Sequence, residues 1–493
     1  MYSIGPYYEV TMPDIAVTKA LNLIEIKPAK PVVHLLAPEL IYKRLQFNHG
    51  YKARKRGVST KTEILYELDE KNDVMWTFAG LLDRVVKLLR GAGFDPLLSE
   101  RGRLKYPEPV WDNLRGVTLR DAQVSMLATM VSCDRGQLNG CTGIGKTFLI
   151  TQFTKLYPHP DFGIIICAQQ VPVVRSIYNS ISEVYPNDIG KVGGGSYEPN
   201  RITVTTSKSL LKAPIDTCKV FIYDEVHTAA APQVSEALIQ LKTCRMFGMS
   251  ASTECRSDKA DLLTEALFGP VRIHAGYKEA QERGFVAQVD GYFYEIEVPT
   301  CHKENRIARK RELVWRNTSK NKYIAEIASH WEQQLDDPQI VIMTDTIEHV
   351  LRIGMFLPDY DVMYASLDNK KLDRFRRMGI VPDTFSTMSE KQKEQKQIDI
   401  ENGVIRKVIT TTTLGTGVDL RNLDVFIRAD SGSSDISNVQ FRGRVARGSK
   451  GVYCDFWVTG DDNEYSRSRK RHRACQTDGW NMRRVPMGEV CGR

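Results

Sequence analysis

The sequence predicts an α/β protein in which two tandem parallel-sheet lobes follow a small α+β N-terminal domain. Its 493 residues exceed what a single hydrophobic core usually serves. In the later part of the chain, short apolar runs alternate with helical stretches, a pattern typical of parallel sheets that are covered on both faces. This alternation occurs twice along the chain. We therefore expect domains at residues 1–112, 113–290 and 291–493.

The N-terminal domain combines strand-like and helical patterns. Residues 32–36 and 64–68 are strand-like runs, and an amphipathic helix is expected between Trp76 and Leu89. Residues 107–109, Pro-Glu-Pro, are typical of a linker between this domain and the first lobe.

Cations and aromatic residues alternate over residues 42–56 of this domain. Lysine and arginine can neutralise phosphates while aromatic rings stack on bases. We therefore expect a DNA contact at Arg54 and Lys55, so that the domain is a DNA-binding accessory domain. A solvated strand face with tyrosines in the core is the alternative.

Each lobe has three clear strand candidates. A fourth run in the first lobe, residues 135–139, forms only a weak strand pattern. The charged residues 372–397 are either a solvated helix face or a contact for a nucleic-acid backbone. The clear candidates are residues 163–167, 202–205 and 220–223 in the first lobe and 340–343, 407–410 and 425–427 in the second.

The composition is that of an ordinary globular protein, with 42% hydrophobic and 26% charged residues. A net charge of +8 permits a nucleic-acid partner without requiring one. The ten cysteines include no C-x-x-C pair, which argues against a disulfide framework or a zinc site. No apolar run approaches the roughly 20 residues that span a bilayer, and the first residues lack the pattern of a signal peptide. We therefore expect a cytoplasmic protein without a membrane partner.

Residues 140–147, Gly-Cys-Thr-Gly-Ile-Gly-Lys-Thr, match the pattern of a phosphate-binding loop. Glycines such as Gly143 and Gly145 let backbone N–H groups turn toward phosphate oxygens, and the next helix presents its positive N-terminus to the same anion. Lys146 would reach the β- and γ-phosphates, and Thr147 would ligate Mg²⁺. ATP and Mg²⁺ are the expected nucleotide and metal ion.

A second motif supports this prediction. The apolar run at residues 220–223 ends in Asp224 and Glu225. Asp224 can hold Mg²⁺, and Glu225 can polarise the attacking water. His227 either packs locally or senses the γ-phosphate and relays its state to the second lobe, and we favour the sensing role.

Residues 224–227, Asp-Glu-Val-His, resemble the DExH box of superfamily 2 helicases, which implies that the two lobes are RecA-like. Residues 250–252, Ser-Ala-Ser, resemble the Ser-Ala-Thr motif of that family. The resemblance implies that Ser250 and Ser252 couple the ATP site to the nucleic-acid site.

Residues 119–123, Leu-Arg-Asp-Ala-Gln, look like the family element that precedes the phosphate loop. The resemblance implies that Gln123, together with Arg120, contacts the adenine, since a glutamine can form two hydrogen bonds with its N6 and N7 edge. An exposed polar position on a helix is the alternative for Gln123.

The second lobe contains a Thr-rich turn with a Gly-x-Gly-x-Asp pattern after an apolar strand, which resembles motif V of the family. Small hydroxyl side chains and glycines let a backbone approach closely and bind phosphates. The resemblance implies that Thr411 and Thr412 contact the nucleic-acid backbone, and that Gly417 and Asp419 contact the nucleotide. A helix cap is the alternative.

Residues 440–447, Gln-Phe-Arg-Gly-Arg-Val-Ala-Arg, resemble motif VI. On a helix, Gln440, Arg444 and Arg447 share one face. Because an arginine fork can stabilise charge on a phosphoryl group in transfer, we assign catalytic roles to all three, with Arg447 as the arginine finger. A solvated basic helix is the alternative.

Weaker matches mark the track of a nucleic-acid strand. They resemble motifs Ia, Ib, Ic and IV of the family, and an ordinary loop or helix cap is the alternative for each. The residues are Gln169 for motif Ia, Gly194 for motif Ib, Thr205 and Thr206 for motif Ic, and Thr344 for motif IV.

Within superfamily 2 the chain looks most like phage helicases of the UvsW type, on residues 189–195 and 318–325. This resemblance implies an ATP-dependent DNA helicase or translocase that remodels forks, D-loops and Holliday junctions in replication, recombination or repair. For a phage protein the compartment is the cytoplasm of the host cell.

Three other functions compete with this one. They are a DExH-type RNA helicase, a duplex translocase that never separates strands, and a non-catalytic clamp that uses ATP as a switch. The presence of Lys146, Glu225 and Arg447 argues against the clamp. We favour a monomer, and we expect the basic residues 467–473 either to hold DNA or to be partly disordered.

Overall fold

The computed structural model describes residues 15–20, 23–47, 58–101, 106–141, 143–241, 244–251, 261–284, 286–303, 305–364, 367–411, 423–432, 450–486 and 488–489. The described residues form two compact units. One unit consists of residues up to 139 together with 147–274, and the other of residues 140–146 together with those from 275 onward. No helix in this described part is long and apolar enough to cross a membrane.

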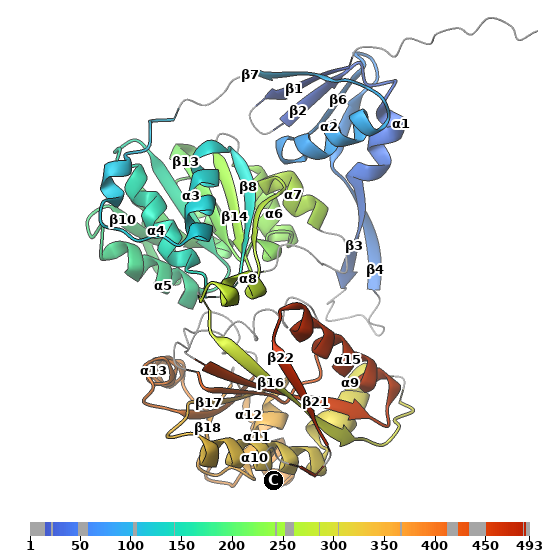
Figure 1. The fold of residues 1–493 in the computed structure, drawn as a ribbon, viewed down its shortest axis with the longest axis vertical. Coiled ribbons are helices and arrows are strands. Elements are labelled where there is room, and N and C mark those ends of the chain that lie inside the picture. The colour runs from blue at the N-terminus through green and yellow to red at the C-terminus, as the bar shows by residue number, and fades with distance from the viewer. Residues whose placement is uncertain are drawn as a thin grey trace, which may run out of the picture. The chain divides into compact units, whose positions relative to one another are not determined.

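The N-terminal domain is built on a five-stranded mixed sheet in the order β5-β6-β2-β1-β7, and β3 pairs with β4 in a separate two-stranded sheet. Figure 1 shows α2 lying against the five-stranded sheet and the β3–β4 hairpin extending away from it. The elements are β1 (Ala16–Ala20), β2 (Leu23–Lys27), α1 (Val33–Leu36), η1 (Ala37–Leu40), β3 (Ile41–Phe47), β4 (Val58–Ile64), β5 (Tyr66–Asp69), β6 (Val74–Phe78), η2 (Ala79–Leu81), α2 (Leu82–Gly91) and β7 (Leu97–Arg101).

Two local predictions for this domain were wrong. Residues 32–36 are helical rather than a strand, because Val32, Leu36 and Leu40 are buried at helical spacing and Leu36 N–H bonds to the Val32 carbonyl at 3.0 Å. The predicted helix begins only at Leu82, since Trp76 belongs to strand β6. Its predicted apolar face is confirmed: α2 packs into the core of the first unit.

The first lobe is an eight-stranded sheet in the order β11-β10-β12-β9-β13-β14-β8-β15, in which the strands from β10 to β8 are parallel. Phe153 of α4 packs against Phe247 of β14 on one face, while α6 and α7 join the core on the other. The elements are η3 (Trp111–Leu114), α3 (Asp121–Ser132), β8 (Arg135–Gly140), α4 (Lys146–Leu156), β9 (Gly163–Ala168), α5 (Val171–Ser182), β10 (Ile189–Gly193), β11 (Ser196–Glu198), β12 (Ile202–Thr206), η4 (Ser207–Lys212), η5 (Ile215–Thr217), β13 (Cys218–Asp224), η6 (Val226–Thr228), α6 (Pro232–Ile239), β14 (Arg245–Ser250), α7 (Asp261–Phe268) and β15 (Val271–Ala275).

The N-terminal domain packs on the first lobe through α2 and α7. The guanidinium of Arg84 binds the carboxylate of Glu265, with its shortest N–O distance at 2.6 Å, and Arg272 lies 2.7 Å from Asp83. Gly80 lies so close to the Glu265 carbonyl that a Cβ atom there would collide with it. The domain and the lobe therefore share one continuous core.

The second lobe is a seven-stranded parallel sheet in the order β18-β19-β17-β20-β21-β16-β22. Its buried strands confirm the three predicted runs and, with the first sheet, the predicted α/β class. The elements are α8 (Tyr277–Glu282), β16 (Gln288–Glu297), α9 (Arg306–Lys310), η7 (Arg311–Trp315), α10 (Thr318–Gln334), β17 (Ile340–Thr344), α11 (Ile347–Gly354), β18 (Asp361–Met363), α12 (Asn369–Arg377), α13 (Glu390–Glu401), β19 (Lys407–Thr411), β20 (Val425–Arg428), β21 (Lys450–Thr459), α15 (Asp462–Thr477) and β22 (Asn481–Val485).

The basic residues 467–473 are not a tail but part of the regular helix α15. Asp461 caps the start of this helix by accepting a hydrogen bond from the Glu464 N–H at 3.2 Å. Arg471 is buried in the lobe, whereas Arg469 and Arg473 are exposed. The alternative of partial disorder is therefore wrong for these residues, and their contact with DNA stays a prediction.

Candidate functional site

Strand β8 leads into the phosphate-loop motif and is fully buried despite its polar sequence. Arg135 donates a hydrogen bond to the Leu267 carbonyl, and Gln137 donates one to the Gly269 carbonyl at 2.7 Å. These bonds offset the cost of burying the two polar side chains. The weak strand pattern at residues 135–139 thus conceals a buried strand that lies between β14 and β15 in the sheet.

The loop that follows β8 has the backbone of a phosphate-binding loop. Gly143 and Gly145 have φ angles of 93° and 89°, which side-chain-bearing residues rarely adopt. Lys146 is the first residue of α4, and its ammonium donates to the Gly140 carbonyl at 3.1 Å. Thr147 occupies the next position on the helix. The loop and the free N–H groups of the first helical turn together form a typical anion-binding arrangement.

The carboxylates lie at the edge of the sheet from which this loop departs. Strands β13, β14 and β8 are neighbours and parallel, with Asp224 in register with Met249 and Ser250 with Asn139. Their carboxyl ends therefore meet at one edge. Asp224 is the last residue of β13 and is only 9% exposed.

Glu225 adopts a left-handed backbone conformation, with φ 61° and ψ 52°. This region is unfavourable for a residue with a side chain and is typical of strained functional positions. The Glu225 carbonyl accepts hydrogen bonds at 2.9 Å from both the N–H and the hydroxyl of Thr228. Gly248 leaves room for the turn, because a Cβ atom there would collide with Val226.

The turn brings three predicted residues into mutual contact. The Ser250 hydroxyl donates to Oε2 of Glu225 at 3.1 Å and lies 2.9 Å from Nδ1 of His227. The same Nδ1 lies 3.3 Å from Oε2 of Glu225. Ser250 and His227 are buried, while the Glu225 side chain is 30% exposed. The solvent-exposed carboxylate of Glu225 therefore contacts the buried hydroxyl of Ser250 and the buried imidazole of His227.

Gln123 lies in the first turn of α3 and is buried, so the alternative of an exposed helix position is wrong. Its Oε1 accepts a hydrogen bond from the Arg120 N–H at 3.0 Å, which caps the helix. The carboxamide is thus fixed in place. Its predicted contact with adenine remains a prediction.

Three predicted nucleic-acid positions lie at the carboxyl ends of neighbouring strands. Gln169 follows β9 and is exposed, Thr206 ends β12, and Gly194 lies in the tight β10–β11 turn with a φ angle of 64°. A Cβ atom on Gly193 would lie within 3 Å of the hydroxyl oxygens of Thr206 and Ser209. Ser209, which the sequence analysis does not name, therefore lies beside these positions.

Three other residues that were predicted to contact nucleic acid are buried. Thr205 is fully buried and its hydroxyl donates to the Thr206 carbonyl at 3.3 Å. Thr344 is fully buried at the end of β17, and Thr346 caps α11. Thr411, the last residue of β19, is 7% exposed. Burial leaves the hydroxyls of Thr205 and Thr344 unable to reach a bound strand in this structure.

Several predicted residues lie outside the described residues. They belong to the Ser-Ala-Ser motif at residues 250–252, to motifs V and VI, and to the segment between β3 and β4. They are Ser252, Thr412, Gly417, Asp419, Gln440, Arg444, Arg447, Arg54 and Lys55.

The donors available for a divalent cation are oxygens. The described residues contain no group of three or more His, Cys, Asp or Glu side chains suited to a metal. Mg²⁺ typically takes one or two protein ligands together with phosphates and waters. The hydroxyl of Thr147 and the carboxylate of Asp224 fit that requirement.

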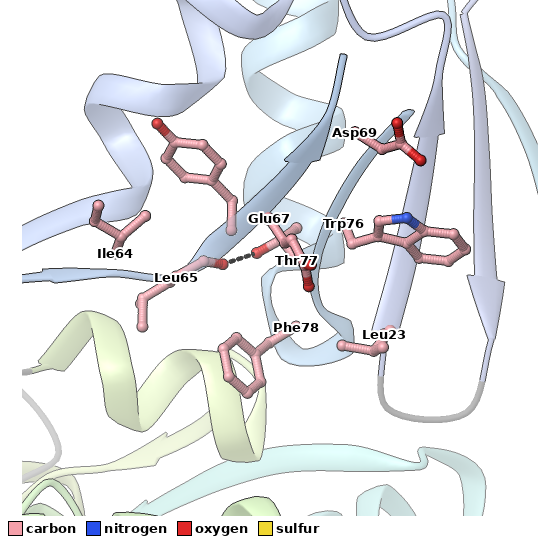
Figure 2. A pocket seen from close by; sticks show the side chains of 9 residues that line it. Leu23, Ile64, Leu65, Glu67, Asp69, Trp76, Thr77 and Phe78 are labelled. Atoms are coloured by element: carbon pink, nitrogen blue, oxygen red, sulfur yellow. Dashed lines mark hydrogen bonds between the residues drawn. The ribbon is translucent and has the colours of Figure 1, made fainter. Parts of the chain in front are cut away.

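A cavity of about 520 Å³ opens on the five-stranded sheet of the N-terminal domain. Figure 2 shows Trp76 and Phe78 of β6 along its wall, with Glu67 and Asp69 of β5 beside them. Aromatic rings could stack on bases, but the two carboxylates repel phosphates. The cavity therefore gives no support to a backbone contact on this face.

Two protein-family models match the chain. The first, described as type III restriction enzyme, res subunit, matches residues 116–254, and the second, the helicase conserved C-terminal domain, matches residues 319–449. Together they cover more than half of the chain.

Two curated proteins are similar to this chain. The DNA 3'-5' helicase XPB of Kineococcus radiotolerans is 23% identical over 328 residues, which is 62% of this chain and 53% of that protein. A protein designated helicase 22 of the Sulfolobus islandicus filamentous virus is 23% identical over 243 residues, which is 49% of this chain and 42% of that protein. The chain thus spans about half the length of the curated relatives it matches.

Solved structures resemble the fold. Dbp5 of S. cerevisiae, bound to RNA and ADP BeF3, aligns with a TM-score of 0.53 and 13% identity over 76% of this chain and 92% of that one. T4 UvsW aligns over 96% of this chain and 100% of that one, with 16% identity and a TM-score of 0.42. The Dbp5 alignment supports the two-lobed fold and, at this identity, the fold alone.

Proposed function

The chain belongs to superfamily 2 of the ATP-dependent helicases, and we propose that it uses ATP hydrolysis to remodel branched DNA. The observation that carries the proposal is the contact of Glu225, Ser250 and His227 at the edge of the sheet from which the phosphate loop departs. In this arrangement the proposed catalytic carboxylate of Glu225 contacts Ser250 and His227. The hydrogen bonds of these two residues therefore depend on where the carboxylate lies.

ATP binding is assigned to the loop and the first turn of α4. Gly143 and Gly145 shape the loop, and Lys146 exchanges its bond with the Gly140 carbonyl for the β- and γ-phosphates. Gln123, with Arg120, contacts the adenine. The buried, capped position of Gln123 supports this role, because a fixed carboxamide loses little entropy on binding.

Thr147 and Asp224 would hold Mg²⁺. When bound, the ion neutralises charge on the phosphates of ATP. Asp224 suits this task because the strand end fixes its backbone and the side chain is nearly buried.

Glu225 orients and polarises the water that attacks the γ-phosphate. The Ser250 hydroxyl restrains one carboxylate oxygen, so that the other can face the water. His227 contacts both residues, and a shift of Glu225 on hydrolysis therefore changes the hydrogen bonds of Ser250 and His227. Ser252, two residues further on, carries that change toward the nucleic-acid contacts.

The second lobe supplies the positive charges that act on the phosphoryl group in transfer. Arg444 and Arg447 stabilise the phosphoryl group in transfer, with Gln440 beside them and Gly417 and Asp419 contacting the nucleotide. An arginine of this kind contributes roughly 10³-fold or more to the rate. Because these residues come from a separate lobe, each turnover requires the lobes to close and reopen, which moves one nucleic-acid contact relative to another.

The nucleic-acid track uses Gln169, Gly194, Thr206 and Ser209 in the first lobe and Thr411 and Thr412 in the second. Exposure of Gln169 and the grouping of Gly193, Thr206 and Ser209 support the first part. Thr205 and Thr344 would contribute only after a rearrangement that exposes them. Arg54 and Lys55, between the strands of the β3–β4 hairpin, contact a DNA arm.

The substrate class is DNA, and the processes are replication, recombination or repair in the cytoplasm, which is that of the host cell if the protein is phage-encoded. The protein acts as a monomer with domain boundaries at residues 112 and 290. The name of the bacterial relative, a DNA 3'-5' helicase, supports DNA over RNA.

The test compares ATP hydrolysis and strand displacement on single-stranded, duplex, forked and four-way DNA and on structured RNA. We expect the largest ATPase stimulation and strand displacement with forked or four-way DNA. Stronger stimulation by RNA would overturn the DNA assignment, and ATPase without displacement on any DNA would favour a duplex translocase.

A further inference from the structure

Helix α15 and the strands β21, β16 and β22 form a basic surface on the second lobe, and the proposed mechanism gives this surface no role. Figure 1 shows α15 lying beside β21 and β22. Tyr465, Arg469 and Arg473 are spaced four residues apart and therefore form one row along the helix. This row faces away from the core, because the buried side of the helix consists of Glu464, Ser468, Arg471 and Cys475.

Arg469 and Arg473 are exposed cations whose charge is not neutralised within the lobe. Neither forms an ion pair with any residue that the structure describes, whereas Arg467 binds Glu464 and Arg471 binds a buried aspartate. The two exposed arginines lie one helical turn apart, or about 6 Å along the helix axis. Their charges are therefore available to an anion outside the protein.

The strands add a third arginine to this row. Arg484 of β22 places its guanidinium 4.2 Å from the ring centroid of Trp457 in β21, and it also binds the carboxylate of Glu295 in β16. The rings of Tyr465 and His472 stand nearly perpendicular to the Trp457 ring, with centroids at 5.7 and 5.3 Å. These ring contacts join the helix and the strands into one continuous surface.

The aromatic rings of this surface hold arginines rather than nucleic-acid bases. The Arg469 guanidinium lies 5.6 Å from the Tyr465 ring centroid, so that Tyr465 and Trp457 each have a cation over one face. Both rings are also half-buried. Proteins that bind single strands stack bases on open ring faces. Ordered arginines without such a platform suit the phosphate backbone of a duplex, in which the bases are already stacked.

This surface is separate from the predicted nucleic-acid contact of the same lobe. Thr411 ends β19, the second strand in the order β18-β19-β17-β20-β21-β16-β22, whereas Arg484 lies on β22 at the opposite edge. Five strand spacings of about 4.8 Å separate β19 from β22, which places the two strands roughly 24 Å apart. A contact at Arg484 is therefore additional to one at Thr411.

We propose that Arg469, Arg473 and Arg484 bind the phosphate backbone of a duplex arm of branched DNA. The inference rests on the proposed function, which assigns DNA as the substrate. It adds a second contact on this lobe, which holds a duplex arm without requiring ATP or a particular base sequence.

The test combines Arg469→Gln with Arg473→Gln, two changes at exposed side chains that leave the core intact. The matched control is Lys322→Glu, which changes the net charge by the same amount at a side chain that is 68% exposed. Lys322 lies on α10, which packs against the other face of β16 through the bond of Trp331 to Tyr294. Fluorescence anisotropy without ATP measures the affinity for a duplex of about 20 base pairs and for one of its strands, from about 50 to 200 mM NaCl.

Each phosphate contact contributes about 0.9 to the slope of log affinity against log salt, so the double variant should flatten the duplex slope by about 1.8. Its duplex affinity at about 0.1 M salt should fall about 10-fold or more. We expect less than about a twofold change for the single strand and for the control.

Glu295→Gln provides a test of opposite sign, because it removes the carboxylate that neutralises Arg484. Duplex affinity should rise about two- to fivefold, since one repulsive charge beside the phosphates is lost. Glu326→Gln on α10 is the control for the change in net charge, and its affinity should stay at the wild-type level.

An unchanged duplex slope in the double variant would overturn the proposal and favour an acidic protein as the partner of this surface. Equal losses on duplex and single strand would contradict the duplex assignment, and equal effects in the controls would show that only net charge matters. A wild type that binds neither DNA would contradict the proposed function as well, whereas wild-type binding with an unchanged slope contradicts this inference alone.

Discussion

The hydroxyl of Ser250 donates a hydrogen bond to Oε2 of Glu225 at 3.1 Å, across two neighbouring parallel strands of the first lobe. The bond fixes one oxygen of a carboxylate whose backbone is already held in a strained conformation. It places the coupling serine in direct contact with the proposed catalytic base.

Ser250→Ala should therefore lower kcat for ATP hydrolysis by about 10-fold while leaving KM nearly unchanged, because the carboxylate loses a charge-assisted hydrogen bond of about 1.5 kcal/mol that orients it. Steady-state ATPase assays with Ser180→Ala as the control check this, since the Ser180 hydroxyl bonds only to its own helix at the Ser176 carbonyl. Wild-type kcat in Ser250→Ala would show that the contact does not orient Glu225.

Gly248→Ala tests the strained turn itself. The added methyl group meets Val226 and pushes on the turn that holds Glu225 in its left-handed conformation. We expect a loss of about 1–3 kcal/mol in the free energy of unfolding, as for other overpacked cores, together with a lower kcat. Thermal unfolding and ATPase assays measure the two effects. If activity and stability both stayed at wild-type levels, Gly248 would not be what makes room for the turn.

Sequence patterns identify the chemistry of the site better than its supporting structure. The loop at residues 140–147 and the pair Asp224 and Glu225 are recognisable because phosphate and metal binding restrict residue types at fixed spacing. Strand β8 shows only a weak strand pattern in the sequence because it buries polar side chains. Arg135 and Gln137 can be buried since each donates a hydrogen bond to a carbonyl group 132 residues away in sequence. No local pattern reports such a bond.

The same limit applies to the C-terminal region. The run of basic residues at 467–473 predicts a segment that holds DNA or is partly disordered, yet it is helical and Arg471 is buried against Asp455. The left-handed backbone of Glu225 is likewise invisible in sequence, because it depends on the space that Gly248 leaves on the neighbouring strand.

The ion pair between Arg84 and Glu265 joins the N-terminal domain to the first lobe. Its contribution to stability can be measured by reversing its charges. Arg84→Glu should destabilise the first unit by about 1 kcal/mol, because it puts two carboxylates together at a partly exposed position. Restoration of the thermal midpoint in Arg84→Glu with Glu265→Arg would confirm the pair. Arg90→Glu, exposed on the same helix, is the control; an equal effect in Arg90→Glu would mean that only net charge matters.

The buried imidazole of His349 should make the folded protein less stable in acid. Burial, with Lys320 nearby, lowers the pKa of this imidazole to about 3; Lys310, Arg352 and Asp430 also act on it. Its Nε2 lies 3.0 Å from Oδ1 of Asn321. Because an unfolded histidine titrates near 6.5, the unfolded state binds more protons below that pH, so stability is present above pH 6.5 and falls below it.

Between pH 7.5 and 5.0 the wild type should lose about 2 kcal/mol more free energy of unfolding than His349→Gln, which can still donate to Asn321 but does not titrate. Denaturant unfolding at both pH values measures this, with the exposed His302→Gln as the control. Parallel losses in the wild type and His349→Gln would exclude His349 as the source.

The most direct test of the central claim is strand displacement from forked DNA by wild-type protein and by Glu225→Gln, each with ATP and Mg²⁺. Loss of the catalytic base should lower ATP hydrolysis by about 10²- to 10⁴-fold. The account predicts that the wild type displaces the strand, while Glu225→Gln binds ATP and the fork with wild-type affinity but releases no strand. Displacement by Glu225→Gln at the wild-type rate would contradict it.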